Sequence, residues 1–307
     1  MIDFIGIGAQ KAGTTWLYKN LEAMPQFSLP SMKEIHYFDR AVNYPSPDML
    51  REPKAMKKIF SPYWAQKFGR KMYAAAKKSD WDEMKWLANS WFSNIDDDWY
   101  LSIFENLEGI KGEITPSYSM LERHDIEKMY AVAPQAKLIL MLRNPVDRAW
   151  SHYRFHKGKG QYAMQHEEIM AFMKNDAQRR RSDFRTVIEN YYSVYPANQI
   201  LIGFYDAIKH QPKALLTEIV QFLGGDPKEI EAYCTLERKI NVSKAVACPV
   251  EVRKELVDMY SDAVRDLAEN FDGYFSYWQC VNENIEGTID PKNLSPVLKL
   301  NTAPSFK

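Results

Sequence analysis

The order of hydrophobic and polar positions predicts alternating strands and helices over most of the chain. Four short apolar runs rich in β-branched or aromatic residues are typical of buried strands, and they span residues 2–8, 110–114, 137–142 and 199–205. Apolar residues at helical spacing predict helices at residues 14–24, 125–133, 145–156, 212–223 and 250–270. Because helices that alternate with strands cover both faces of a parallel sheet, we expect an α/β fold with a central parallel sheet.

Residues 40–109 interrupt this alternation. They contain five of the eight tryptophans, namely Trp64, Trp81, Trp86, Trp91 and Trp99. Their charge is divided, since residues 51–78 carry nine basic side chains and one acid, whereas residues 79–108 carry eight acids and one base. Solvated helix faces and core packing would explain this composition; the alternative is a mainly helical insertion that shapes a substrate cleft. After Trp278 the pattern is lost, so we expect an irregular tail over residues 281–307.

The overall composition narrows the class of protein. The 307 residues suffice for one sizeable α/β domain, and 40 basic residues balance 40 acidic ones, which gives no general attraction to nucleic acid or to a membrane. No apolar run approaches the roughly 20 residues of a membrane span. Cys234, Cys248 and Cys280 lack metal-binding spacing and are expected to be free buried thiols. Nothing at the start of the chain resembles a signal peptide, so we expect a cytoplasmic protein.

The turn after the first predicted strand has the composition of a phosphate-binding loop. The stretch GIGAQKAGTTW, residues 6–16, has glycines at positions 8 and 13, and Thr14 stands where nucleoside triphosphatases carry a lysine. Backbone N–H groups in such a turn, together with the start of a helix, bind an anion without help from side chains. Lys11 lies inside the loop instead, beside the expected position of a single terminal phosphate and its bridging oxygen. No acidic strand end that would hold Mg²⁺ is found, so no metal site is expected.

Five stretches resemble the sulfotransferases that use 3′-phosphoadenosine 5′-phosphosulfate (PAPS). They are QKAGTT at 10–15, KEIHYFD at 33–39, GEITPSY at 112–118, LRNPVDRAWSHY at 142–153 and FYDAI at 204–208. The second and third stretches are most similar to the glycosaminoglycan (heparan sulfate)-type branch and its bacterial relatives. The resemblance implies a P-loop-like three-layer α/β fold and one sulfotransferase domain over residues 1–280. Residues 40–98 match no part of the family pattern, and we expect the insertion at residues 40–109 to be an acceptor-side subdomain.

The resemblance also implies a reaction. A sulfuryl group would pass from PAPS to a hydroxyl, less readily to an amine, by in-line displacement without a metal. Charge would develop on the oxygen that bridges the sulfur and the 5′-phosphate. Lys11 would stabilise that charge, an interaction that is stronger in the transition state than in the ground state.

The donor-binding residues implied by the resemblance lie at the ends of the predicted strands. In the loop they are Gln10, Lys11, Ala12, Gly13, Thr14, Thr15 and Trp16; further along the chain they are Arg143, Ser151, Tyr205, Asn241, Ser243 and Lys244. Arg143 and Ser151 would bind the 3′-phosphate, and Tyr205 would lie against the adenine. Residues 241–244 would close on the 3′-phosphate. Arg143 would otherwise only end a strand and pair with Asp147, and Tyr205 would be a core tyrosine.

A general base is expected because the acceptor hydroxyl loses its proton as sulfur is attacked. Glu113, at the end of the second predicted strand, matches the glutamate that serves in glycosaminoglycan-type enzymes. A half-buried carboxylate beside Lys11 would have its pKa raised by burial or lowered by the cation. His36 is the alternative, since a neutral imidazole accepts a proton readily at neutral pH. Lys33 would contact the sulfate or steady the glutamate, unless it is an ordinary surface lysine.

The sequence is also compatible with two other functions. An inactive relative that only holds adenosine 3′,5′-bisphosphate would keep Lys11 and Arg143 but would need no base. A P-loop kinase would need a lysine after Gly13, and Thr14 is there instead. The acceptor is a small molecule, a glycan or an acyl or polyketide hydroxyl, and no motif chooses among them. The oligomeric state is equally open.

Overall fold

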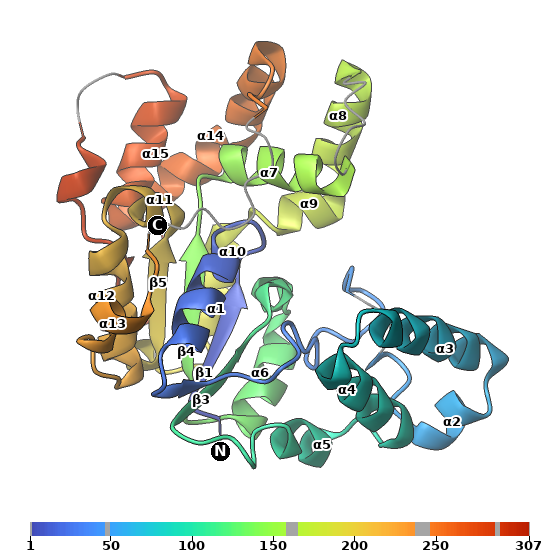
Figure 1. Cartoon of the computed structure of the whole chain (residues 1–307). Helices are drawn as coiled ribbons and strands as arrows, with labels where there is room; N and C mark the ends of the chain where they lie inside the picture. The colour runs from blue at the N-terminus through green and yellow to red at the C-terminus, as the bar shows by residue number, and fades with distance from the viewer. Residues whose placement is uncertain (1, 47–49, 158–164, 237–245, 286–288, 307) are drawn as a thin grey trace.

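A six-stranded sheet forms the centre of the protein (Figure 1). The computed structural model describes residues 2–46, 50–157, 165–236, 246–285 and 289–306. The strands are β1 (Phe4–Gly8), β2 (Phe27–Ser28), β3 (Ile110–Ile114), β4 (Lys137–Leu142), β5 (Ile200–Phe204) and β6 (Val297–Leu298), in the order β2-β3-β1-β4-β5-β6. Only β6 runs antiparallel to its neighbour. The predicted α/β fold with a central, mostly parallel sheet is therefore confirmed, and two short edge strands are added to it.

The central strand, β1, positions the loop that follows it. All five of its residues are buried, and it pairs with β3 on one side and β4 on the other. Phe4 lies opposite both Gly112 and Lys137, so the three strands point the same way and end at the same edge of the sheet. Ligands bind at this edge in open α/β sheets, because the loops that leave the carboxyl ends of the strands meet there.

Helices cover both faces of the sheet, as the sequence predicts. On one side α1 (Thr14–Ala23), α12 (Pro212–Leu223) and α13 (Glu229–Tyr233) lie together, and on the other α6 (Arg123–Val132) packs against α10 (Phe184–Tyr192) (Figure 1). Beyond the carboxyl ends of the strands lie α7 (Pro145–Lys157), α8 (His166–Lys174), α9 (Asp176–Arg180), α11 (Tyr205–His210), α14 (Val250–Phe271) and α15 (Tyr274–Asn282) (Figure 1). The 3₁₀ turn η2 (Pro116–Met120) follows β3, η3 (Ala197–Gln199) directly precedes β5, and η4 (Pro291–Asn293) contacts α11. Each helix expected from periodicity is present, with its ends within about two residues of the prediction.

About half of the segment between β2 and β3 is helical, and it lies beside the sheet (Figure 1). It contains α2 (Ala55–Ile59), α3 (Pro62–Lys77), α4 (Trp81–Phe92) and α5 (Asp97–Ser102). Trp91 is buried and stacks on Phe68 at 4.6 Å, so part of the tryptophan content is a small local core. Asp80 and Asp96 cap α4 and α5, and further acids occupy the first turns of both helices. These positions suit the positive ends of the helix dipoles and explain much of the acidic half.

The C-terminal segment is more ordered than the sequence predicts. Its last strand, β6, pairs with β5 through Ile202 and Leu298, which adds a short paired stretch to the tail that we expected to be irregular. A strand of two residues has no alternation that a sequence pattern would show. The three cysteines are free, as expected, but they are half-buried rather than buried. Over the described ranges, no helix has both the length and the apolar composition needed to cross a membrane.

Candidate active site

The loop between β1 and α1 forms a tight turn at the sheet edge. The N–H of Ala9 donates to the carbonyl of Met141 (2.6 Å), which ties the loop to the end of β4. Gly13 is the N-cap of α1 with φ 92°, a conformation that favours glycine, and a Cβ there would lie 2.4 Å from the end of the Ile208 side chain. The first turn of α1 contains no acidic side chain. Its N–H groups and dipole therefore suit an anion, as the loop sequence predicts.

Lys11 stands in a strongly positive environment. Burial, together with the charges of Arg143 and Arg154, lowers the pKa of Lys11 to about 8. Its ammonium lies 4.1 Å from the centre of the Phe155 ring. Nearby cations destabilise one another in the absence of a counter-ion, so this arrangement favours a bound anion such as a phosphate.

Arg143 joins this group from the end of β4. Its Nη1 donates to the carbonyl of Lys11 (3.2 Å), and its guanidinium lies 4.2 Å over the ring of Tyr205. Its Nε is buried and has no hydrogen-bond partner among the described residues. The alternative pairing with Asp147 is wrong, because Asp147 pairs with Arg253 at 3.2 Å. The structure thus brings Lys11, Arg143 and Tyr205 together, and the unsatisfied donor fits an anionic group.

For the other residues predicted to bind PAPS, the structure shows fewer contacts. Ser151 is half-buried on α7, two turns beyond Arg143. Gln10 accepts a hydrogen bond from Arg181 (2.6 Å), and the indole N–H of Trp16 donates to the carbonyl of Leu236 (3.2 Å). Asn241, Ser243 and Lys244 lie outside the described residues.

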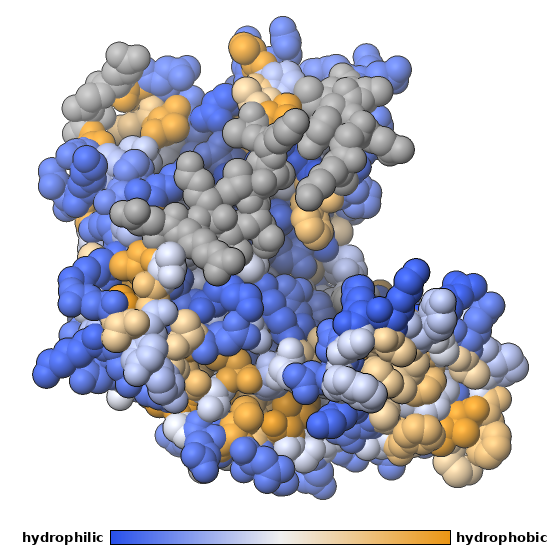
Figure 2. Space-filling view, viewed as in Figure 1, coloured by the Kyte–Doolittle hydropathy of each residue, from blue (hydrophilic) through white to orange (hydrophobic). Residues whose placement is uncertain are grey.

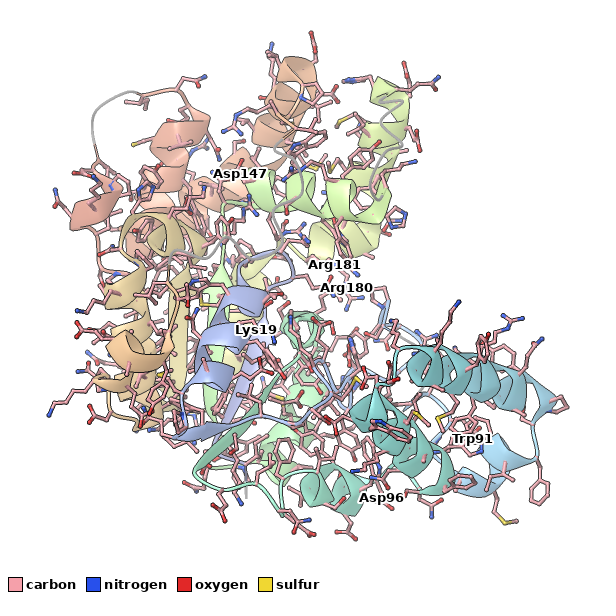
Figure 3. All side chains as sticks on the ribbon, in the orientation of Figure 1. Lys19, Trp91, Asp96, Asp147, Arg180 and Arg181 are labelled. Carbon is pink, nitrogen blue, oxygen red and sulfur yellow. The ribbon has the colours of Figure 1, made fainter. Side chains whose placement is uncertain are left out.

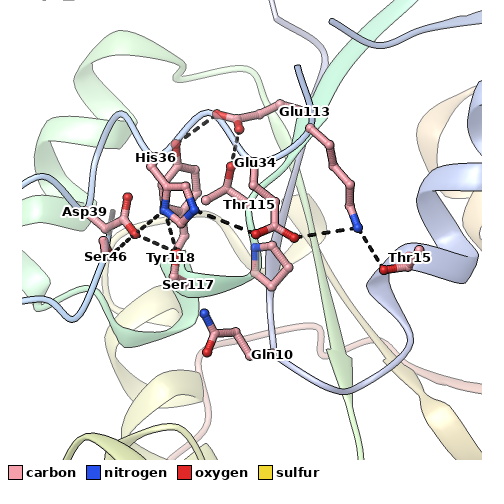
Figure 4. Close-up of polar contacts among 12 residues, drawn as sticks. Gln10, Thr15, Glu34, His36, Asp39, Ser46, Glu113, Thr115, Ser117 and Tyr118 are labelled. Carbon is pink, nitrogen blue, oxygen red and sulfur yellow. Dashed lines mark hydrogen bonds and ion pairs between the residues drawn. The ribbon is translucent and has the colours of Figure 1, made fainter. Parts of the chain in front are cut away.

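A second group of polar side chains reaches from α1 across the segment before α2 (Figure 4). Lys33 donates to the hydroxyl of Thr15 (2.8 Å) and lies 3.6 Å from one oxygen of Glu34. The other oxygen of Glu34 lies 3.7 Å from Nε2 of His36. Nδ1 of His36 lies 2.8 Å from the carboxylate of Asp39. This row of alternating charges connects the phosphate loop to the side of the site that faces the insertion.

His36 is held in its charged form. Asp39 is fully buried and accepts hydrogen bonds from the hydroxyls of Ser117 and Ser46 as well as facing His36. Although burial opposes it, the contacts with Asp39 and Glu34 raise the pKa of His36 to about 9. The expectation of an imidazole that is neutral at neutral pH is therefore wrong. A charged imidazole cannot accept a proton, but it can hold a neighbouring carboxylate.

Glu113 lies deeper than the sequence suggests. It is 2% exposed and accepts hydrogen bonds from the hydroxyls of Thr115 (2.6 Å), Tyr100 (2.7 Å) and Tyr118 (3.1 Å). Burial raises the pKa of its carboxyl. The expectation of a half-buried carboxylate is wrong. Since Tyr118 also accepts from the N–H of Tyr37 (2.9 Å), Glu113 helps to fix the segment that carries Glu34 and His36.

Glu34 is the carboxylate that the sequence analysis overlooked. Its side chain is 37% exposed, and its charge raises the pKa of Lys11, so the two groups interact electrostatically. Against the effect of burial, the contacts with His36 and Lys33 hold the pKa of Glu34 below its usual range. Its position in KEIHYFD, between Lys33 and His36, is the feature of the sequence that could have identified it. Arg181 was also missed, and its contact with Gln10 joins positions too far apart in sequence for any local pattern to show.

These features define a class of protein: an α/β protein with a cationic phosphate site at the carboxyl ends of its strands and a carboxylate row beside it. The chain belongs to the sulfotransferase domain family, whose model matches residues 2–248. The family resemblance seen in the five sequence stretches is confirmed.

Relatives with curated descriptions share parts of this chain. Over 231 residues it is 28% identical to bifunctional heparan sulfate N-deacetylase/N-sulfotransferase 1 of Homo sapiens, which covers 71% of this chain and 21% of that protein. Over 158 residues it is 29% identical to the membrane-associated sulfotransferase kil1 of Dictyostelium discoideum, covering 50% of this chain and 22% of that protein. The chain thus spans less than a quarter of the length of these relatives.

Solved structures share the fold. A sulfotransferase from Alicyclobacillus acidocaldarius superimposes with a TM-score of 0.58 at 19% identity, over 91% of this chain and 99% of that one. The sulfotransferase domain of the olefin synthase from Synechococcus PCC 7002 gives 0.50 at 18% identity, over 85% and 94%. At such identities the comparison establishes the architecture, which is that of the sulfotransferases.

Proposed function

We propose that this protein transfers a sulfuryl group from PAPS to a hydroxyl acceptor. The observation that carries the proposal is the meeting of Lys11, Arg143 and Tyr205 around the phosphate loop, with the ionised Glu34 in electrostatic contact with Lys11. A guanidinium with an unsatisfied buried Nε and an aromatic ring beneath it suits a nucleotide phosphate and its base. Family membership supports the reaction class.

In this proposal the acceptor oxygen attacks sulfur from the side opposite the phosphate. The new S–O bond forms as the bond between sulfur and the 5′-phosphate oxygen breaks, and the electron pair of that bond stays on the phosphate oxygen. The ammonium of Lys11 stabilises the charge that develops there, so we assign no metal to the reaction. Thr14 and Thr15 and the first N–H groups of α1 hold the phosphate. Adenosine 3′,5′-bisphosphate is the second product.

We propose Glu34 as the general base, in place of Glu113 and His36. Glu34 is ionised, partly exposed and oriented by Lys33 and His36, whereas Glu113 is enclosed by three hydroxyl donors. The acceptor proton passes to the Glu34 carboxylate as the S–O bond forms. Asp39 and Glu113 act as positioning residues behind it. Lys33, bonded to Thr15, links the base to the phosphate loop.

We also propose a domain organisation, a location and an acceptor class for this protein. Residues 1–280 form one sulfotransferase domain, residues 40–109 lie on the acceptor side, and the protein acts in the cytoplasm on a glycan, acyl or small-molecule hydroxyl. The surface view shows the outline indented between the insertion and the region of α7 to α9, and Arg180 and Arg181 lie where α9 faces that indentation (Figures 2 and 3). An acceptor that enters there would meet the Glu34 side of the site.

A labelled-donor assay tests the proposal. PAPS carrying sulfur-35 is incubated with panels of glycan, acyl and small alcohols, using the wild type, Lys11→Ala and, as a control, Lys19→Ala, which removes an exposed lysine paired with Glu22 on the same helix. Transfer by the wild type and the control, with a loss of about 10²–10³ in Lys11→Ala, is the expected result. Calorimetry with adenosine 3′,5′-bisphosphate and ATP–Mg²⁺ separates the alternatives. Binding of the bisphosphate without any transfer would indicate an inactive relative, and a preference for ATP–Mg²⁺ would indicate a kinase.

A further inference from the structure

The outer end of the insertion exposes a group of large apolar side chains. Met56, Ile59 and Phe60 at α2 and Tyr63 at the start of α3 are 69%, 41%, 77% and 58% exposed. Met56, Ile59 and Phe60 are three and four residues apart and so share one side of α2, and Tyr63 follows in the first turn of α3. We call these four residues the tip surface. Figure 1 shows α2 at the end of the insertion farthest from the sheet, and Figure 2 shows apolar residues gathered there.

The tip surface is not needed for the core of the insertion. That core lies on the other side of the helices, where Phe68 stacks on Trp91 and Leu87 is buried. Lys58, on the opposite side of α2 from the tip surface, is 1% exposed and donates to the carbonyls of Ser90 and Ser93 at the end of α4. α2 is therefore fixed with its apolar residues turned outward. Grouped exposed residues of this kind mark an interaction surface.

The stretch of chain that contains the tip surface carries mostly basic side chains, although Lys58 is buried beneath it and Lys77 and Lys78 lie at the other end of α3. Residues 51–78 carry nine basic side chains and one acid, Glu52, whose carboxylate accepts from the N–H of Lys54. Lys57 and Arg70 are exposed. Arg70 lies two turns beyond Tyr63 and therefore on the same face of α3. This local excess of positive charge is not seen in the net charge of the whole chain, because residues 79–108 of the same insertion carry eight acids and one base.

We propose that the tip surface docks on an anionic membrane surface. Aromatic and aliphatic side chains enter the boundary between headgroups and acyl chains, while the flanking lysines and arginines contact anionic headgroups. A projecting group of four apolar residues suits a soft lipid interface, whereas a protein partner would have to supply a matching hollow. Each basic residue near the surface is expected to strengthen binding about fivefold. This inference goes beyond the proposed function and does not depend on it.

Sedimentation with vesicles tests the proposal on the full chain, without donor or acceptor. The probes are vesicles of phosphatidylcholine alone and vesicles in which about one third of the lipid is phosphatidylserine. Phe60→Ser removes an apolar contact, and Lys57→Glu with Arg70→Glu reverses two charges. The matched controls are Trp81→Ser, an aromatic that is 68% exposed but lies among acids, and Lys85→Glu in the acidic half.

The expected result is binding to the anionic vesicles only, weakened as salt rises from about 0.1 M to 1 M. Phe60→Ser should reduce binding at least about tenfold. The double reversal should reduce it at least about 25-fold. The two controls should bind as the wild type does. Absence of vesicle binding, or equal losses in Phe60→Ser and Trp81→Ser, would overturn the proposal.

Two further results would assign the tip surface to another occupant and so refute membrane docking. One is a dimer, seen by analytical ultracentrifugation, that Phe60→Ser abolishes. The other is a raised KM for a soluble acceptor in Phe60→Ser without any effect of vesicles. Circular dichroism and thermal melting check that each variant is folded. Failure of the sulfotransferase assay would leave the vesicle result intact, so the two proposals fail separately.

Discussion

The charge state of Lys11 should control the activity at alkaline pH. The pKa of Lys11 is lowered to about 8 by burial and by Arg143 and Arg154, and only the charged form stabilises the leaving phosphate. With that pKa, about 90% of the free enzyme is charged at Lys11 at pH 7 and about 10% at pH 9. The kcat/KM for PAPS reports the free enzyme, so it should fall as pH rises, with a midpoint near pH 8. The phosphates of a bound donor favour the charged form, so the corresponding fall in kcat should lie at higher pH.

Steady-state assays at fixed ionic strength measure both profiles. Lys11→Arg keeps the positive charge at every accessible pH, so its activity should be reduced overall but the fall near pH 8 should disappear. His36 has a pKa of about 9 and gives a second limb, which His36→Asn should remove without moving the first. The reasoning is refuted if the wild-type kcat/KM is flat between about pH 7 and 9.5, or if the same limb persists in Lys11→Arg.

Three more variants test the other assignments. Glu34→Gln should lower kcat by about 10²–10⁴ with little change in the Kd for adenosine 3′,5′-bisphosphate, measured by calorimetry; an unchanged kcat would return the role of base to Glu113. Glu113→Gln should instead lower the free energy of unfolding by about 1–3 kcal/mol, followed by chemical denaturation, because an amide cannot accept from all three buried hydroxyls as the carboxyl group does. Arg143→Ala should weaken binding of the bisphosphate by roughly 1.5–3 kcal/mol and leave binding of a nucleotide without the 3′-phosphate unchanged. Equal losses for both nucleotides would contradict that assignment.

The parts of the fold that follow from local patterns were predictable. The strands β1, β3, β4 and β5 are short and mostly buried, and each is present where the sequence predicts it. The glycines and Lys11 of the loop identify a phosphate site because that chemistry is carried by consecutive residues. The edge strands β2 and β6 have two residues each and leave no periodicity to detect, so they were missed.

The choice of base was not predictable from strand ends. Glu113 occupies a strand end and so has the expected place for a catalytic group, but three hydroxyls from two other segments enclose it. Those contacts depend on how α5 and η2 pack, which no local pattern shows. The charge of His36 is set by its neighbours Asp39 and Glu34, and Asp39 is in turn held by Ser46 and by the distant Ser117. Burial and partners decide the protonation state, and both are tertiary properties.

The backbone conformation supports the assignment of Glu34 to the reaction. Lys11, Glu34 and His36 have φ values of 69°, 63° and 60°, in the left-handed region that side-chain-bearing residues rarely adopt. Each such residue costs of order 1 kcal/mol or more, and it persists only where surrounding contacts over-determine it. Here those contacts are the bond from Arg143 to the carbonyl of Lys11 and the buried Asp39 and Tyr118 behind the segment of Glu34. Glu113 lies in a regular strand and has no such strain. The strained residues are thus the proposed leaving-group cation Lys11, the proposed base Glu34 and its neighbour His36. This coincidence favours a preorganised site built from these three side chains.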